Sequence, residues 1–97
     1  MRADYDSEGD TIRIELEPGR RLGNAEDVSN GAVIVTVHED RPVTVDVIGT
    51  HNGFEDVLCG AAERYELDAE ALVAAAQAAL AAPDRTVTLD VAVRTAA

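Results

Sequence analysis

The 97-residue chain lacks lysine and tryptophan, and it holds only one cysteine and three aromatic residues. A single cysteine excludes an internal disulfide and any zinc site built from several cysteines, so a reducing, cytoplasmic location is expected. No run of apolar residues approaches the roughly 18 that cross a bilayer. Because residues 1–10 carry four acids and no apolar stretch, no signal peptide is expected either.

Basic residues are also scarce, since eight arginines face 19 acids and the net charge is -11. Affinity for nucleic acids and for anionic membranes depends on Lys and Arg near phosphates, so neither is an expected partner. Two explanations of the acid excess stay open. One is a compositional bias of the genome or an adaptation to salt, which keeps a small protein soluble. The other is a surface that attracts a basic protein partner.

The length predicts one domain over residues 1–97. Residues 1–50 have the pattern of a β-meander, residues 52–82 that of a helical pair, and residues 85–94 that of a final strand. The clearest strand is Thr11 to Glu17, in which apolar and polar residues alternate. The expected fold class is α+β: an antiparallel sheet of about five strands, with two helices packed on one face and the C-terminal strand returning to the sheet.

Helix start and stop signals divide the helical part in two. Asn52 is a suitable N-cap for the first helix, and Glu55 stands where it can bond back to the cap. Asp68 is the expected N-cap of the second helix, and Pro83 the residue that stops it. Apolar spacings of three and four predict the buried faces: Val57, Leu58, Ala61, Ala62 and Tyr65, then Leu72, Val73, Ala76, Ala79 and Leu80.

Five acids near the start have the spacing of a metal site. Positions 1, 3, 5, 7 and 12 of a twelve-residue calcium loop are matched by Asp4, Asp6, Glu8, Asp10 and Glu15. An EF-hand places a helix on each side of that loop, whereas only three residues precede Asp4 and a predicted strand follows. A solvated hairpin turn is therefore the favoured interpretation. Calcium remains the alternative, and no other cofactor is expected.

The opening also resembles a known family. Tyr5 to Asp10, followed by the strand of Ile12, Ile14 and Leu16, is similar to the Y-D-x-E-x-D opening of short prokaryotic proteins grouped as domain of unknown function 2283. The resemblance covers residues 1–50. It implies a small β-rich domain without established catalytic activity and, for antitoxin-like members, a protein partner. The two helices and the last strand depart from the family pattern.

Residues typical of catalysis are few, and we expect no enzyme. Cys59 is the only thiol, while His38 and His51 are the only imidazoles. A Cys–His pair needs hydrogen-bond reach and a third orienting group. Cys59 follows Leu58 among small helical residues and is expected to fill the core. His38 is expected at the end of a strand and His51 in a loop.

These observations leave three functional hypotheses. The first is a non-catalytic, regulatory binding module that docks on a basic protein partner. The second is a self-associating homodimer, joined through the edge formed by the last strand or through the alanine-rich helices. The third is the calcium hypothesis. The aromatic residues Tyr5, Phe54 and Tyr65 are expected to pack in the core, with an interface role as the alternative.

Overall fold

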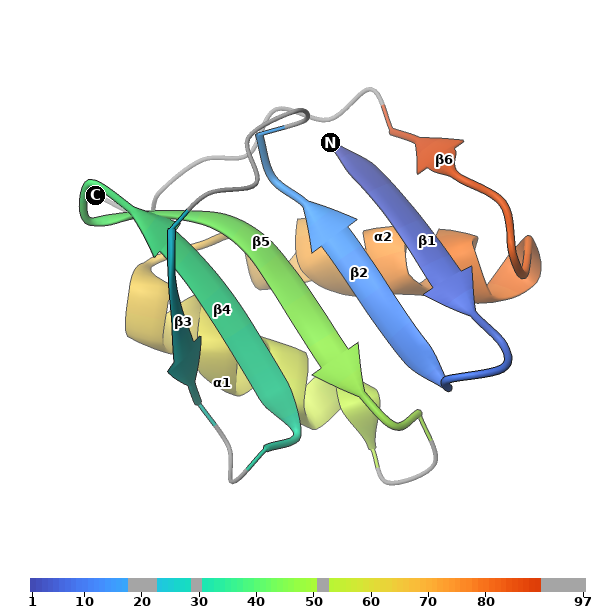
Figure 1. Cartoon of the computed structure of the whole chain (residues 1–97), viewed down its shortest axis with the longest axis horizontal. Coiled ribbons are helices and arrows are strands. Elements are labelled where there is room, and N and C mark those ends of the chain that lie inside the picture. Colours follow the sequence, from blue (N-terminus) through green and yellow to red (C-terminus); the bar gives the residue numbers. More distant parts are fainter. Residues whose placement is uncertain (18–22, 29–30, 51–52, 90–97) are drawn as a thin grey trace.

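The computed structural model of the chain describes residues 1–17, 23–28, 31–50 and 53–89 (Figure 1). The two longest strands come from segments rich in β-branched residues, and the second helix comes from the alanine-rich segment. In chain order the elements are β1 (Arg2–Asp6), β2 (Thr11–Glu15), β3 (Asn24–Asp27), β4 (Val33–His38), β5 (Arg41–Ile48), α1 (Phe54–Tyr65), α2 (Ala69–Ala81) and β6 (Val87–Thr88).

All of these strands pair antiparallel in one sheet, in the order β3-β4-β5-β2-β1-β6. The expected α+β fold is confirmed, but the expected meander over residues 1–50 is wrong, because β2 pairs with β5 and not with β3. In that pairing Ile12 lies opposite Val47 and Ile14 opposite Val45, and all four are fully buried. The four residues of β3 are exposed, so β3 offers β2 no such apolar pairs.

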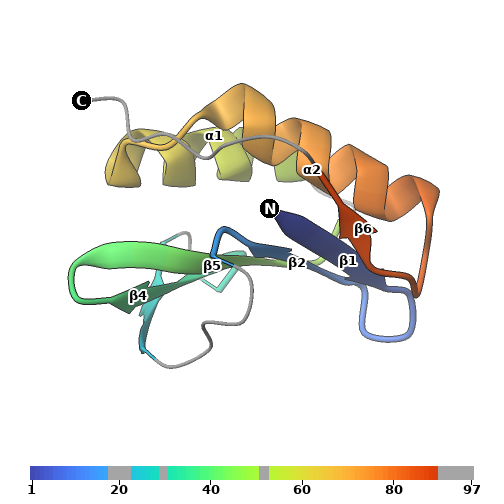
Figure 2. The same cartoon turned by 90° about the horizontal axis from the view of Figure 1, so that it is seen from above.

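Both helices cover the same face of the sheet, as predicted, and Figure 2 shows the two layers edge-on. The side chains of the sheet that point toward the helices form one core with the inner sides of α1 and α2. Small alanine side chains on both helices let them lie close to the strands. The buried members are Ala3, Ile12, Ile14, Leu16, Val33, Val35, Val45, Val47, Leu58, Ala61, Ala62, Leu67, Leu72, Ala75, Ala76 and Ala79.

The start of α1 differs from the prediction. The N-cap is Gly53, with a left-handed φ of 72° and no side-chain cap hydrogen bond. The expected cap, Asn52, lies outside the described residues. Glycine adopts this φ without a Cβ clash, so the chain turns into the helix through Gly53, whose carbonyl accepts a hydrogen bond from the amide of Asp56 at 3.1 Å.

The start and end of α2 follow the prediction. The Asp68 carboxylate accepts a hydrogen bond from the amide of Ala71 at 3.2 Å, which makes Asp68 the N-cap. The helix ends at Ala81, two residues before Pro83. The residue before a proline is driven out of the helical region, so the sequence sets this end directly.

The chain returns to the sheet after α2, as expected, though by a shorter strand within the described residues. β6 pairs with β1 of the same chain, with Val87 opposite Ala3 and Thr88 opposite Arg2. The predicted strand over residues 85–94 therefore begins at Val87, and its part from residue 90 onward lies outside the described residues.

A hydrogen-bonded contact joins this return to the first hairpin. The amide and the hydroxyl of Ser7 donate to the two carboxylate oxygens of Asp84, at 3.0 and 2.7 Å. These donors hold the pKa of Asp84 below its usual value of 3.8, because they stabilise the charged form. Ser7 and Asp84 are 77 residues apart, so this contact closes the loop formed by almost the whole chain.

The three aromatic residues pack against the core, as predicted. Tyr5, Phe54 and Tyr65 are each partly buried. The tyrosine hydroxyls are hydrogen-bonded to carboxylates, because that of Tyr5 donates to Asp10 and that of Tyr65 to Glu26. Among the described residues, neither helix has the length and apolar character needed to cross a membrane.

Candidate functional site

The acidic turn between β1 and β2 is held by its own carboxylates. One carboxylate oxygen of Asp6 accepts hydrogen bonds from the amides of Glu8 and Gly9, at 3.1 and 3.2 Å. Short side chains that bond the backbone two or three residues on are typical of tight turns. The predicted hairpin turn is therefore present, and Asp6 shapes it.

Asp10 ties this turn to the end of β5. Its carboxylate accepts hydrogen bonds from the hydroxyls of Tyr5 and Thr50, at 2.7 and 2.6 Å, and from the amide of Thr50 at 3.1 Å. The hydrogen bond to this carboxylate raises the pKa of the Tyr5 phenol. Asp10 is thus occupied by three donors, and it acts as a structural link between two ends of strands.

The remaining calcium candidates point elsewhere. Asp4 and Glu15 lie on the uncovered face of the sheet, opposite Arg13 and Arg2 in the pairing of β1 with β2. Glu8 is exposed in the turn. Within the described residues no three His, Cys, Asp or Glu side chains come together as metal ligands. The calcium spacing in the sequence therefore does not become a coordination sphere.

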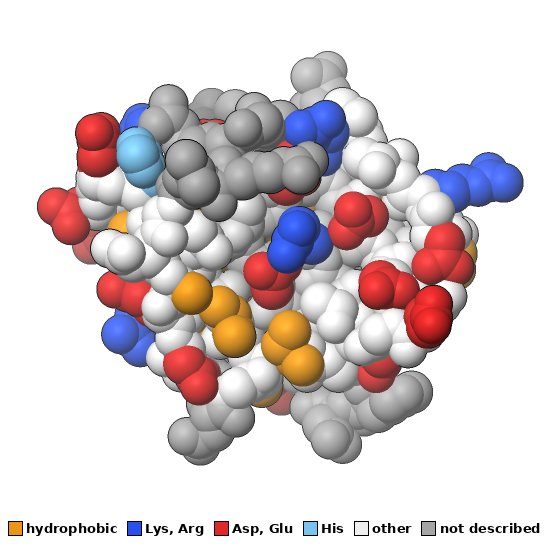
Figure 3. All heavy atoms as spheres, viewed as in Figure 1, with side chains coloured by type: hydrophobic (Ala, Val, Ile, Leu, Met, Phe, Trp, Pro, Cys, Tyr) orange, Lys and Arg blue, Asp and Glu red, His pale blue; other side chains and the backbone are white. Residues whose placement is uncertain are grey.

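Arginine and acidic side chains both lie on the uncovered face of the sheet, which faces the viewer in Figure 3, and several acidic side chains gather on the right of that view. The Nε of Arg13 lies 2.8 Å from the Asp46 carboxylate, and Asp4 is the cross-strand neighbour of Arg13 on the other side. The bond to Asp46 raises the pKa of Arg13. Burial raises the pKa of Asp4, although the charge of Arg13 opposes that rise. Arg2 pairs with Glu15 at 2.8 Å, so Arg2 and Arg13 are each paired with a carboxylate on this face.

The thiol lies outside the core, contrary to prediction. Cys59 is exposed, because it is displaced by about 100° around α1 from the buried Leu58. His38 ends β4 as expected, and its Nε2 lies 3.9 Å from the carboxylate of Glu39. His51 lies outside the described residues. No hydrogen bond joins Cys59 to His38, so the described residues contain no Cys–His pair.

A cleft opens where the end of α1 meets the sheet. Its lining comes from three segments: residues 16–17 just after β2, residues 40–42 at the turn into β5, and residues 63–67 at the end of α1. Its volume is about 650 Å³. Proteins commonly bind ligands in concave sites of roughly 300–1,000 Å³, which makes this cleft the leading candidate site.

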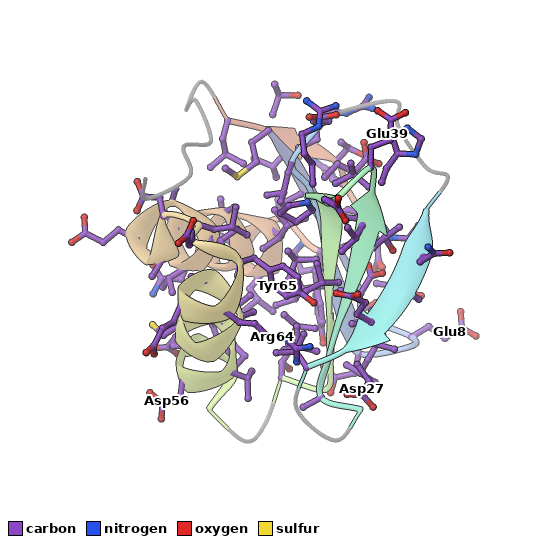
Figure 4. The ribbon with its side chains drawn as sticks, turned by 90° about the vertical axis from the view of Figure 1, so that its left-hand side faces the viewer. Glu8, Asp27, Glu39, Asp56, Arg64 and Tyr65 are labelled. Atoms are coloured by element: carbon purple, nitrogen blue, oxygen red, sulfur yellow. The ribbon has the colours of Figure 1, made fainter. Side chains whose placement is uncertain are left out.

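Tyr65 forms one wall of the cleft and joins α1 to the edge of the sheet. Its hydroxyl donates to the Glu26 carboxylate on β3, and Figure 4 shows the side chain lying between α1 and the sheet, with Arg64 beside it. Burial raises the pKa of the Tyr65 phenol, and the bond to Glu26 adds to the rise. The Arg64 guanidinium lies 5.5 Å from the ring centroid, a cation–π distance.

The helices and the turn between them carry six exposed acids. Arg64 is the only basic residue between positions 53 and 81. These six acids make no ion pair with another described residue. We call them the acidic helical face: Glu55, Asp56, Glu63, Glu66, Asp68 and Glu70.

No family model, curated protein or solved structure matched the chain. The resemblance of residues 1–50 to domain of unknown function 2283 therefore stays a prediction. Sequence reasoning missed both the cleft and the acidic helical face. The acidic helical face was visible in the sequence, as six acids around one arginine at helical spacings. The cleft was not visible in the sequence, because three separate segments form it.

Proposed function

We propose that this protein is a non-catalytic binding module that docks on a basic protein partner through the acidic helical face. The observation that carries the proposal is the uneven placement of the arginines that accompany the acids. On the uncovered face of the sheet, Arg2 and Arg13 are paired with Glu15 and Asp46 at 2.8 Å. On the helical side, six exposed acids face water around Arg64 alone.

Such a surface favours encounter with a cation. Charges of one sign that are gathered on one side produce a field that speeds the approach of an oppositely charged protein, and salt screens this field within about 8–10 Å. The partner implied by the resemblance of residues 1–50 to antitoxin-like proteins agrees with a binding role. No step of chemistry is required of the protein itself.

A homodimer is the second hypothesis, and it has less support. β6 pairs with β1 of its own chain, so the last described strand needs no neighbouring copy. Ile48 is the only large hydrophobic residue exposed among the described ones, at 45%. The acidic helical faces of two copies repel each other. Light scattering at high micromolar concentration separates the hypotheses, because a monomeric mass at that concentration excludes the homodimer.

A labelled nona-arginine peptide and two matched variants test the proposal. Glu55→Gln with Glu70→Gln removes two charges from the acidic helical face, while Glu8→Gln with Glu39→Gln removes two from exposed turns of the sheet. Both variants have the same net charge, so general attraction is equal. By fluorescence anisotropy, the helical variant is expected to bind about threefold to tenfold more weakly than the turn variant. Equal weakening in both variants, or no binding at about 20 mM salt, overturns the proposal.

A further inference from the structure

We propose that the cleft lined by residues 16–17, 40–42 and 63–67 binds an arginine side chain of the basic partner. This inference rests on the proposed function and adds a specific place of contact to it. The cleft adjoins the acidic helical face, because Glu63 and Glu66 belong to both. The cleft therefore lies next to the surface that attracts a basic partner.

The floor of the cleft is apolar. Leu16 and Leu67 are only 7% and 6% exposed, so each shows a small hydrophobic surface, and Pro42 and the ring of Tyr65 are partly buried beside them. Arginine has a three-carbon stem that packs on such a surface while its charged end stays in water. A volume of about 650 Å³ leaves room for this side chain and the adjoining backbone.

The rim of the cleft is acidic. Asp40, Glu63 and Glu66 are exposed and make no ion pair with another described residue. The two arginines of the lining are already engaged. Arg41 lies 3.3 Å from the Glu17 carboxylate, and Arg64 lies over the ring of Tyr65.

A guanidinium fits a rim of this kind better than a compact cation does. Its planar array of five N–H donors contacts a carboxylate through two parallel hydrogen bonds, and it reaches a second carboxylate at the same time. A hydrophobic floor beneath separated carboxylates thus matches both parts of an arginine side chain. A wholly apolar segment would match only the floor of the cleft, and an acidic segment would be repelled by its rim.

Tyrosine emission reports directly on the cleft. The chain has no tryptophan and only two tyrosines, so in a Tyr5→Phe background Tyr65 is the single emitter. The probe is the peptide acetyl-Gly-Arg-Gly-Arg-Gly-amide, titrated at low salt. We expect a saturable change in Tyr65 emission, which the paired substitution Glu63→Gln with Glu66→Gln weakens about tenfold in affinity.

The matched control carries Glu55→Gln with Glu70→Gln in the same background. It has the same net charge but leaves the cleft lining intact, so it is expected to lose only about twofold. Anisotropy of a labelled copy of the peptide measures binding independently of Tyr65. Circular dichroism verifies that every variant is folded.

The outcomes separate the cleft from the broader proposal. Equal losses in the two variants, or binding by anisotropy without a change in Tyr65 emission, overturn the cleft inference and leave the proposed function standing. Absence of binding to the peptide and to nona-arginine overturns both. A selective loss in the Glu63 and Glu66 variant supports both.

Discussion

The hairpin turn between β4 and β5 is strained, and relieving the strain is expected to stabilise the protein. His38 pairs with Arg41, so the loop consists of Glu39 and Asp40 alone. Their φ angles are 51° and 63°, which is the left-handed pair of a type I′ turn. Asn-Gly is the preferred sequence there, because glycine has no Cβ and asparagine tolerates positive φ.

The magnitude follows from these two angles. For a residue with a Cβ, the left-handed conformation costs about 1–2 kcal/mol of conformational free energy, and the cost is smaller for aspartate. The new glycine reduces the gain from removing this cost by about 0.5–1 kcal/mol, because it increases the conformational entropy of the unfolded chain. Glu39→Asn with Asp40→Gly is therefore expected to raise the free energy of unfolding by about 1 kcal/mol. In a domain of this size that gain raises the melting temperature by about 4–8 °C.

Thermal unfolding followed by circular dichroism measures the effect, and urea unfolding gives the free energy. Glu8→Gly is the control, since Glu8 lies in an exposed turn but has no positive φ. Glycine there adds freedom to the unfolded chain without relieving strain, so Glu8→Gly is expected to lower the melting temperature or leave it unchanged. A double variant that melts at or below the wild-type temperature refutes the reasoning.

Three further outcomes test the fold. Asp68→Ala removes the cap of α2 and is expected to cost about 0.5–2 kcal/mol in urea unfolding. Leu72→Ala empties a fully buried position and is expected to cost about 2–5 kcal/mol, with the fold retained by circular dichroism. Ser7→Ala lowers the unfolding midpoint at neutral pH. Because the pKa of Asp84 is lowered from 3.8, the ionic contribution is present above that pH and fades below it, so the difference from wild type shrinks in acid.

Local signals in the sequence predicted the elements well. Alternation of Ile12, Ile14 and Leu16 with polar residues indicated a strand with one buried face, and the structure buries all three. Asp68 and Pro83 marked the start and end of α2, because capping and proline sterics act within a few residues. Such features depend only on neighbouring residues along the chain, so they can be recognised in a single sequence.

The errors came from non-local or competing effects. Asn52 has the better capping side chain, but Gly53 supplies a left-handed turn that starts the helix one residue later. Cys59 is a residue type that is often buried, yet its position around α1 places it in water. The order of the strands was missed because the pairing of β2 with β5 joins Ile12 to Val47, 35 positions apart.

The candidate site was less predictable than the fold. The acids around Asp4 attracted attention through their spacing, whereas the structure uses Asp6 and Asp10 to hold turns. The cleft needs the end of α1 beside the turn into β5, and only tertiary packing brings these together. The acidic helical face, in contrast, follows from helical spacing once the buried side of each helix is known.

Docking through the acidic helical face is tested by locating the residues that a basic ligand contacts. Backbone amide shifts measured by NMR during titration with nona-arginine locate that contact. We expect the largest shifts in α1, in α2 and at residues 40–42. The amide shifts around Arg13 and Asp46, on the uncovered face of the sheet, are expected to change little. If the largest shifts instead fall around Arg13 and Asp46, the protein does not bind a basic partner through the acidic helical face.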